Sequence, residues 1–172
     1  MHLKYRSPSG EERRWTLKEV AQGFPLGHPS HPMFVHFPVA YYIAVLTFDV
    51  LTRIHPNAGL VFAATLLIIG AFAGTVFAAA TGLIDWWGMV RGSKKRRWAT
   101  KHLLLQLTTF AFFVAALALR WSHRHDPRAS VAWIIVEAVG VAFLVVGQWF
   151  GGVLVYEMGM RVRTTSRAGS TD

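Results

Sequence analysis

Four long apolar stretches constrain the fold of this chain more than any other feature. They lie near residues 33–53, 58–84, 102–121 and 131–156. A helix that crosses a bilayer needs about 20 mostly apolar residues, and each stretch is long enough. The sequence therefore predicts an all-α integral membrane protein, a bundle of four transmembrane helices within residues 28–160. No internal repeat is apparent.

The positive charges are divided unevenly between the two sides of this predicted bundle. An even number of spans places both termini and the middle loop on one side, which carries 14 of the 18 Lys and Arg residues. The positive-inside rule puts that side in the cytoplasm. The basic run RGSKKRR of the middle loop suits anionic lipid headgroups. A net charge of +9 distributed in this way does not indicate nucleic-acid binding.

Two short segments flank the bundle on the cytoplasmic side. In residues 1–27, Ser9 and Glu12 have the spacing of a capping box, which marks the start of a helix. We expect a short amphipathic helix there, lying on the membrane surface. Residues 161–172 are predicted to form a cytoplasmic tail.

The residue types that are missing narrow the possible functions. The chain has no cysteine, which excludes disulfides, iron–sulfur ligation and thiol catalysis. It also has no serine nucleophile elbow, phosphate-binding loop or HExxH pattern, so the common hydrolase motifs are absent. We therefore do not expect a stand-alone enzyme.

Polar side chains gather at the cytoplasmic ends of the predicted helices. His36 lies near the start of the first span and His102 starts the third. These two spans run in the same direction, so the two imidazoles lie at similar depth. Histidines from two helices are a common way to hold b-type haem in a membrane bundle. We expect His36 and His102 to be axial ligands of haem b in a redox or electron-transfer subunit.

Other polar groups at that end are candidates for supporting these ligands. Pro38 suits the first position of a helix. That start would place His36 at the helix cap, where an imidazole tends to stay neutral and able to bind metal. Carboxylates and other acceptors orient ligand histidines. The predicted supporting residues are Asp85, Tyr156, Glu157, His31 and His28, the last two in His-Pro dipeptides outside the membrane. At the other end, Asp49 and Arg53 have the spacing of a local salt bridge.

Two other interpretations of these polar residues stay open. His36, His102, Asp85 and Glu157 are also the ligand types that zinc, iron or manganese prefers, which would make a non-haem metal site. Alternatively no cofactor is bound, and the same side chains join the helix ends in a structural or assembly subunit of a membrane complex.

Small residues recur at helical spacing in two of the spans. Such patterns let helices approach closely in membranes, and they would also make room for a flat porphyrin. The residues are Gly70, Gly74, Ala78 and Gly82 in the second span, and Gly147 and Gly151 in the fourth.

Several sequence blocks together resemble a known family. GHPSHPMFVHFPVAYY, ATGLIDWWG and GGVLVYEMG, with the histidine that starts the third span, are similar to bacterial membrane proteins catalogued as domain of unknown function 2231. The resemblance covers about residues 26–162 and implies a bacterial inner-membrane protein. Some relatives are fused to Rieske-type or cytochrome-like domains, which favours electron transfer with a quinone or a redox partner. The family's recurrent polar residues fall on His28, His31, His36, Asp85, His102 and Tyr156.

One position departs from the family pattern. Relatives often have a histidine just before the glycine of the last block, where this chain has Met158. Because methionine also ligates haem iron, Met158 is either a replacement ligand or the mark of a lost site. As partners we expect a second copy of the chain or the other subunits of a larger membrane complex.

Overall fold

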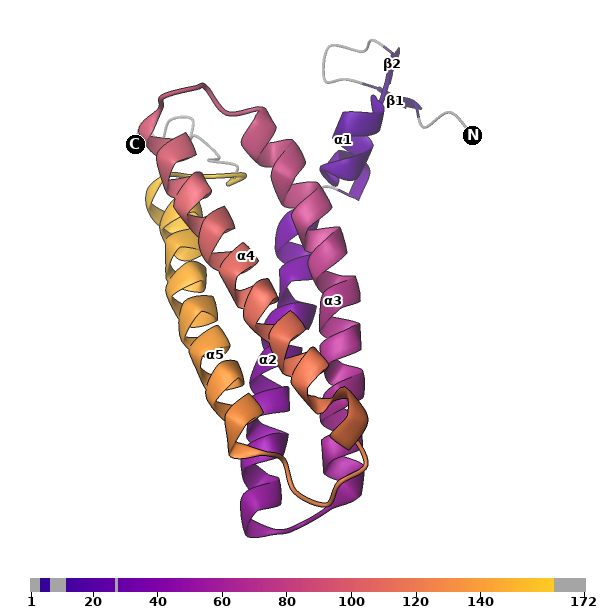
Figure 1. Ribbon diagram of the computed structural model, residues 1–172. Helices are drawn as coiled ribbons and strands as arrows, with labels where there is room; N and C mark the ends of the chain where they lie inside the picture. The colour runs from indigo at the N-terminus through magenta and orange to yellow at the C-terminus, as the bar shows by residue number, and fades with distance from the viewer. Residues whose placement is uncertain (1–3, 7–11, 27, 163–172) are drawn as a thin grey trace, which may run out of the picture.

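The structure is a computed structural model that describes residues 4–6, 12–26 and 28–162. Its main body consists of α2 (Ser30–Ile54), α3 (Ala58–Trp87), α4 (Lys94–Arg120) and α5 (Val131–Gly152), and a π-helical turn, Val153–Glu157, continues α5 (Figure 1). Within the described residues, these four helices are long and apolar enough to cross a membrane. The predicted four-helix membrane bundle is therefore confirmed.

α4 starts earlier than the third predicted span. It begins at Lys94, because the side-chain oxygen of Ser93 caps it by accepting a hydrogen bond from the backbone N–H of Arg96 at 3.1 Å. Lys and Arg are good helix formers, so the basic run KKRR forms the first turn of α4 rather than part of a loop. His102 consequently lies two turns inside α4 and not at its start.

α2 also starts earlier than expected, at Ser30. Pro38 lies inside this helix and not at its first position. Its ring packs against α3 at Gly74, where an added Cβ would lie 2.9 Å from Pro38 Cδ. The earlier start places His31 in the first turn of α2, so His31 belongs to the bundle rather than to a turn outside it.

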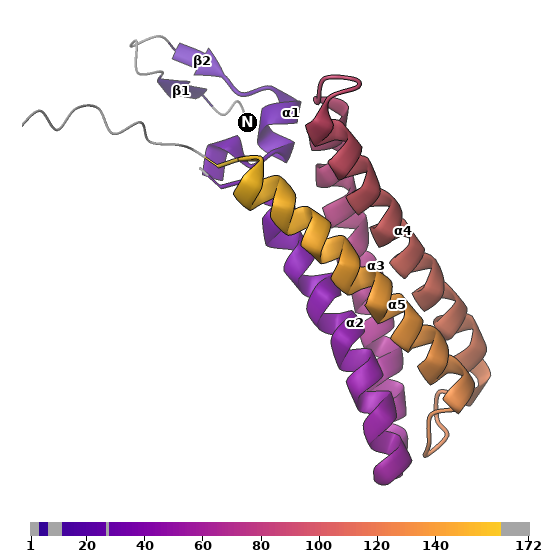
Figure 2. The same ribbon diagram turned by 90° about the vertical axis from the view of Figure 1, so that its left-hand side faces the viewer.

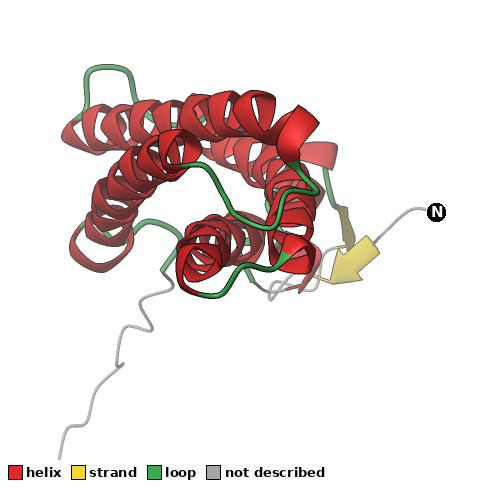
Figure 3. Ribbon diagram, turned by 60° about the horizontal axis from the view of Figure 1, so that its bottom comes forward, coloured by secondary structure: helices red, strands yellow, loops and turns green. Residues whose placement is uncertain are grey.

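The four helices pack as two antiparallel hairpins, α2–α3 and α4–α5. Further contacts join α2 to α5 and α3 to α4, so α2 and α4 lie diagonally across the bundle and run in the same direction (Figure 3). Their inner side chains meet at the centre, where Tyr42 stacks on Phe113 with ring centroids 4.1 Å apart. This pair forms the middle of the buried apolar core.

The two hairpins face each other in a constant register. Residues of α2 meet residues of α4 that are 71 positions later in the chain, at three levels of the bundle. The pairs are His31 with His102, Tyr42 with Phe113, and Asp49 with Arg120. The fold therefore contains a structural repeat that the sequence did not reveal.

A small subdomain precedes the bundle. Strands β1 (Lys4–Arg6) and β2 (Glu12–Arg14) pair antiparallel, and α1 (Leu17–Ala21) follows them. Figure 2 shows this subdomain at the same end of the bundle as the end of α5. The chain thus enters and leaves the bundle at one end.

The short N-terminal helix is present, but it begins later than its predicted capping box. Glu12 lies in β2, where pairing with β1 excludes a helix, and Ser9 lies outside the described residues. The capping box is formed by Thr16 and Glu19 instead, each accepting a backbone hydrogen bond from the other. Leu17 at the start of α1 is 90% exposed, so this helix carries an apolar side chain on its surface.

Candidate functional site

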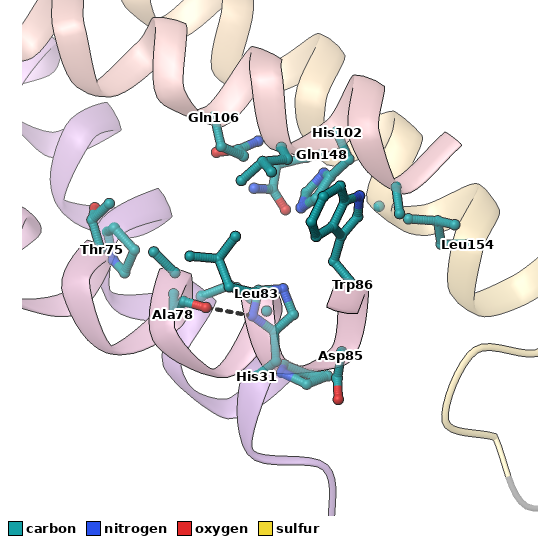
Figure 4. A pocket seen from close by; sticks show the side chains of 18 of the residues that line it. His31, Thr75, Ala78, Leu83, Asp85, Trp86, His102, Gln106, Gln148 and Leu154 are labelled. Carbon is teal, nitrogen blue, oxygen red and sulfur yellow. Dashed lines mark hydrogen bonds between the residues drawn. The ribbon is translucent and has the colours of Figure 1, made fainter. Parts of the chain in front are cut away.

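The inner faces of the helices leave a cavity of about 140 Å³ at the end of the bundle where the chain enters and leaves. His31 of α2 and His102 of α4 line it from opposite sides, and Figure 4 shows a nitrogen of each ring on the side that faces the other ring. The ring centroids are 6.4 Å apart and the ring planes cross at 89°. The remaining wall is mostly apolar, with a few polar side chains that include Thr75 and Gln106.

Each histidine is held by a backbone carbonyl of the neighbouring helix. His31 Nδ1 lies 2.8 Å from the carbonyl oxygen of Ala78, and His102 Nδ1 lies 2.7 Å from that of Gly147. A carbonyl oxygen can only accept, so both Nδ1 atoms carry a proton and donate it. In a neutral imidazole, Nε2 then has a free lone pair. Carbonyls orient metal-binding histidines in this way.

A glycine one turn after each carbonyl makes room for the ring. An added Cβ at Gly82 would lie 2.8 Å from His31 Cε1, and one at Gly151 would lie 3.1 Å from His102 Cε1. Ala78 precedes Gly82 by four residues, as Gly147 precedes Gly151. The small-residue pattern of α3 and α5 therefore builds the same histidine environment twice, once in each hairpin.

The outer end of the cavity is closed by a cluster of polar contacts around Asp85. Asp85 accepts hydrogen bonds from Gln22 at 2.9 Å and from Arg161. Arg161 also lies over the ring of Phe24, with its Cζ 5.3 Å from the centroid. These contacts join the end of α3 to the segments before α2 and after α5.

The structure does not bring His36 and His102 together. His36 lies on the exposed outer face of α2 and does not line the cavity. Five residues separate it from His31, and at 3.6 residues per turn the two side chains leave the helix in different directions. His31, expected only as a supporting residue, faces His102 instead. His28 is exposed and lines a separate surface hollow.

The other predicted residues of the last helix also lie away from the cavity. Tyr156 is 89% exposed and Glu157 is exposed as well. Met158 is absent from the cavity wall, which Met160 lines instead. Among the described residues, no group of three or more His, Asp or Glu side chains could hold a metal ion. The four-residue metal site predicted from the sequence is therefore not assembled.

A second polar cluster lies at the opposite end of the bundle, and sequence reasoning missed it. Asp49 contacts Arg120 and not Arg53, whose guanidinium donates to the carbonyl of Ala129. Glu137 completes the cluster as a second partner of Arg120. The available signal was depth, because the three residues lie toward the same end of the predicted bundle: Asp49 and Arg120 near the ends of the first and third stretches, and Glu137 near the start of the fourth.

Comparison with known proteins gives one match. No curated protein and no solved structure matches the chain. A family model described as a predicted membrane protein (DUF2231) matches residues 27–164. This region contains all four long helices and both histidines of the cavity. The chain therefore belongs to the DUF2231 family of predicted membrane proteins.

Proposed function

We propose that this protein is a membrane electron-transfer subunit that binds haem b between His31 and His102. The observation that carries the proposal is the pair of opposed imidazoles, each with its Nδ1 bonded to a carbonyl and its other nitrogen directed into the cavity. A haem held there would supply a one-electron centre. His31 and His102 would hold the iron between them, and a haem held by two histidines favours electron transfer over binding of oxygen or a substrate.

The separation of the two rings supports a single metal ion on the line between them. A metal lies about 2.0–2.1 Å from a ligand imidazole nitrogen and the ring centre about 1.2 Å further, so two opposite ligands place their centroids about 6.4 Å apart. The observed separation is 6.4 Å. A tetrahedral angle at the metal would reduce it to about 5.2 Å. The spacing therefore leaves room for one metal ion between the two rings.

The number of side chains that could bind a metal ion also favours haem. Asp85 lines the same cavity, but among the described residues no group of three or more His, Asp or Glu side chains could hold a metal ion. The porphyrin nitrogens would supply the other ligands, so His31 and His102 would be enough to hold a haem. The cavity of about 140 Å³ is close in size to one that binds benzene, at about 150 Å³. Haem binding therefore requires wall side chains such as Leu83 and Gln148 (Figure 4) to move outward.

A spectrum of the purified protein tests the proposal. After expression with a haem precursor, we expect one Soret-absorbing haem per chain. His31→Ala and His102→Ala should each lose it, while His28→Ala and His36→Ala should keep it. Pigment-free wild-type protein, or pigment that survives both of the first two substitutions, would contradict the proposal.

The crossing angle of the rings adds a sharper test. With imidazole planes at 89°, the ferric protein should give a strongly anisotropic low-spin electron paramagnetic resonance signal. Coplanar axial imidazoles give a less anisotropic rhombic signal instead. A rhombic signal would show that the rings rotate when haem binds or that other ligands hold the iron.

A non-haem metal ion is the second candidate, and the size of the cavity favours it. An ion with bound water fits about 140 Å³ without movement of the walls. Elemental analysis distinguishes the two candidates: stoichiometric zinc, iron or manganese without a Soret band would support the ion. Protein that lacks both pigment and metal would instead support a structural subunit.

We further propose that the histidine end faces the cytoplasm of a bacterial cell, in keeping with the excess of Lys and Arg at that end. The absence of cysteine permits a direct test with single substitutions. Ser122→Cys, at the opposite end, should react with an impermeant maleimide in intact spheroplasts. Lys94→Cys should react only after lysis, and the reverse result would invert the orientation.

A further inference from the structure

The buried cluster at the end opposite the histidine cavity joins all four helices. Asp49 of α2, Arg120 of α4 and Glu137 of α5 are each 0% exposed. Arg120 Nη2 donates to Asp49 Oδ1 at 2.9 Å, and its Nη1 donates to Glu137 Oε1 at 3.1 Å. Nη2 also donates to the carbonyl oxygen of Val61 in α3 at 3.2 Å. One guanidinium therefore holds two carboxyl groups side by side.

The charges of this cluster do not balance when every group is ionised. Arg120 stays protonated, as arginine does in proteins, and contributes one positive charge. Two carboxylates would leave a net negative charge fully buried inside a membrane-spanning bundle, which is strongly unfavourable. A single proton on the carboxyl pair restores neutrality, as in other pairs of carboxyls that share a site.

The oxygen atoms left over in the cluster show where this proton would lie. Asp49 Oδ2 and Glu137 Oε2 are both buried and have no hydrogen-bond partner among the described residues. The two carboxyl groups bond to the two terminal nitrogens of the same guanidinium, so they lie beside one another. Two unpaired acceptors side by side are unfavourable, and a proton between them converts one of them into a donor.

The other charged groups nearby are engaged elsewhere. Arg53 is exposed and donates to the carbonyl of Ala129 at 3.1 Å. His123 lies 3.0 Å from Asp126, and both of these side chains are more than half exposed. From α3, the described contact with Arg120 is the carbonyl of Val61 alone. The described surroundings therefore supply no second cation to the carboxyl pair.

Trp133 connects the cluster with the surface. The centroid of its ring lies 5.6 Å from Arg120 Cζ and 6.3 Å from the centroid of the His123 ring. His123 belongs to the exposed turn after α4. The indole of Trp133 thus lies between Arg120 and the exposed side chain of His123.

We infer that Asp49 and Glu137 form a proton-binding site, which holds one proton between Oδ2 and Oε2 and exchanges it with water at the end of the bundle opposite the histidines. The site needs no cofactor. It therefore stands independently of the haem proposal, and either can fail without the other.

Infrared spectroscopy of the purified protein tests this inference. At neutral pH the wild type should show the C=O stretching band of a protonated carboxyl group, and the band should shift in D₂O. Asp49→Asn and Glu137→Gln should each remove it. Asp126→Asn, which changes an exposed carboxylate at the same end, should leave it unchanged.

The unfolding temperatures of the same variants give a second test. Because glutamine resembles protonated glutamate in shape and charge, Glu137→Gln should unfold at nearly the wild-type temperature. A purely structural triad with both carboxyls ionised would lose an ion pair and unfold earlier.

Three results would overturn the inference: no carboxyl band in the wild type, a band that survives both substitutions, or a band that does not respond to D₂O. If one variant fails to fold, the other still tests the assignment of the band, and the D₂O response of the wild-type band still tests exchange of the proton with water.

Discussion

α2 and α4 face each other at both ends of the bundle, but their facing side chains interact differently at the two ends. At one end His31 and His102 face each other with ring centroids 6.4 Å apart. At the other end Asp49 and Arg120, equally far apart in sequence, form a hydrogen-bonded ion pair of 2.9 Å. The first end keeps a cavity open, whereas the second is filled by its own side chains.

The difference lies in where the hydrogen bonds run. His31 bonds to α3 and His102 to α5, so each ring is satisfied within its own hairpin and one nitrogen remains for a ligand. Arg120 instead bonds to α2 and α3 of the other hairpin as well as to α5 of its own. The charged end therefore joins the hairpins through one buried guanidinium, whereas at the histidine end other side chains join them, Trp86 with Thr100 and Asp85 with Arg161.

Removal of the central cation should have the largest effect. Arg120→Gln leaves Asp49 and Glu137 buried without a cation, and breaking a buried ion pair costs about 3–5 kcal/mol. We expect a loss of that size in the free energy of unfolding in detergent, measured by chemical denaturation. Arg128→Gln, at an exposed position, is the control. A loss no larger than that of the control would mean that apolar packing alone joins the hairpins.

Substitutions at the histidine end should change the affinity for haem rather than the free energy of unfolding. The Cβ of Gly82→Ala would lie 2.8 Å from His31 Cε1, so the ring must leave the Ala78 carbonyl. We expect haem to bind about tenfold more weakly, or ~1.4 kcal/mol, in a spectral titration of the apoprotein. Gly151→Ala should have a smaller effect, because its Cβ would lie 3.1 Å from His102 Cε1.

Gly88→Ala is the matched control for the histidine end. Its Cβ would have 3.5 Å to its nearest neighbour, the end of the flexible Lys18 side chain. Haem affinity should therefore match that of the wild type. Equal affinities in Gly82→Ala and Gly88→Ala would show that the position of the His31 ring does not determine binding.

The sequence predicted the four spans because length and hydropathy alone decide whether a helix can cross a bilayer. It did not predict which histidine faces His102, since that depends on where α2 begins. The sequence pattern predicts Pro38 at the start of the helix, but a proline is tolerated deeper in a membrane helix when a neighbouring helix fits around it. Gly74 provides that fit.

The charged cluster was missed for a different reason. Asp49, Arg120 and Glu137 are isolated in three separate spans, and a local search paired Asp49 with Arg53 one turn away. In a soluble helix that pairing is reasonable. In a membrane the cost of burial makes ionisable residues at equal depth find each other across helices, so depth is the better guide than spacing.

Substitutions in the middle of the bundle should have the smallest effect. They test whether the two ends act independently. Tyr42→Phe removes the hydrogen bond of 3.1 Å between the Tyr42 hydroxyl and Thr75 Oγ1 but keeps the ring stacked on Phe113. We expect a loss of about 1 kcal/mol in unfolding free energy, with the carboxyl band unchanged. Thr75→Val, which removes the other partner, should cost a similar amount. Tyr42 and Thr75 line the histidine cavity, so a change in the haem spectrum would be a direct effect. A change in the carboxyl band would show that the two ends are coupled through Tyr42 and Phe113, because α2 and α4 meet at this stack between the two ends.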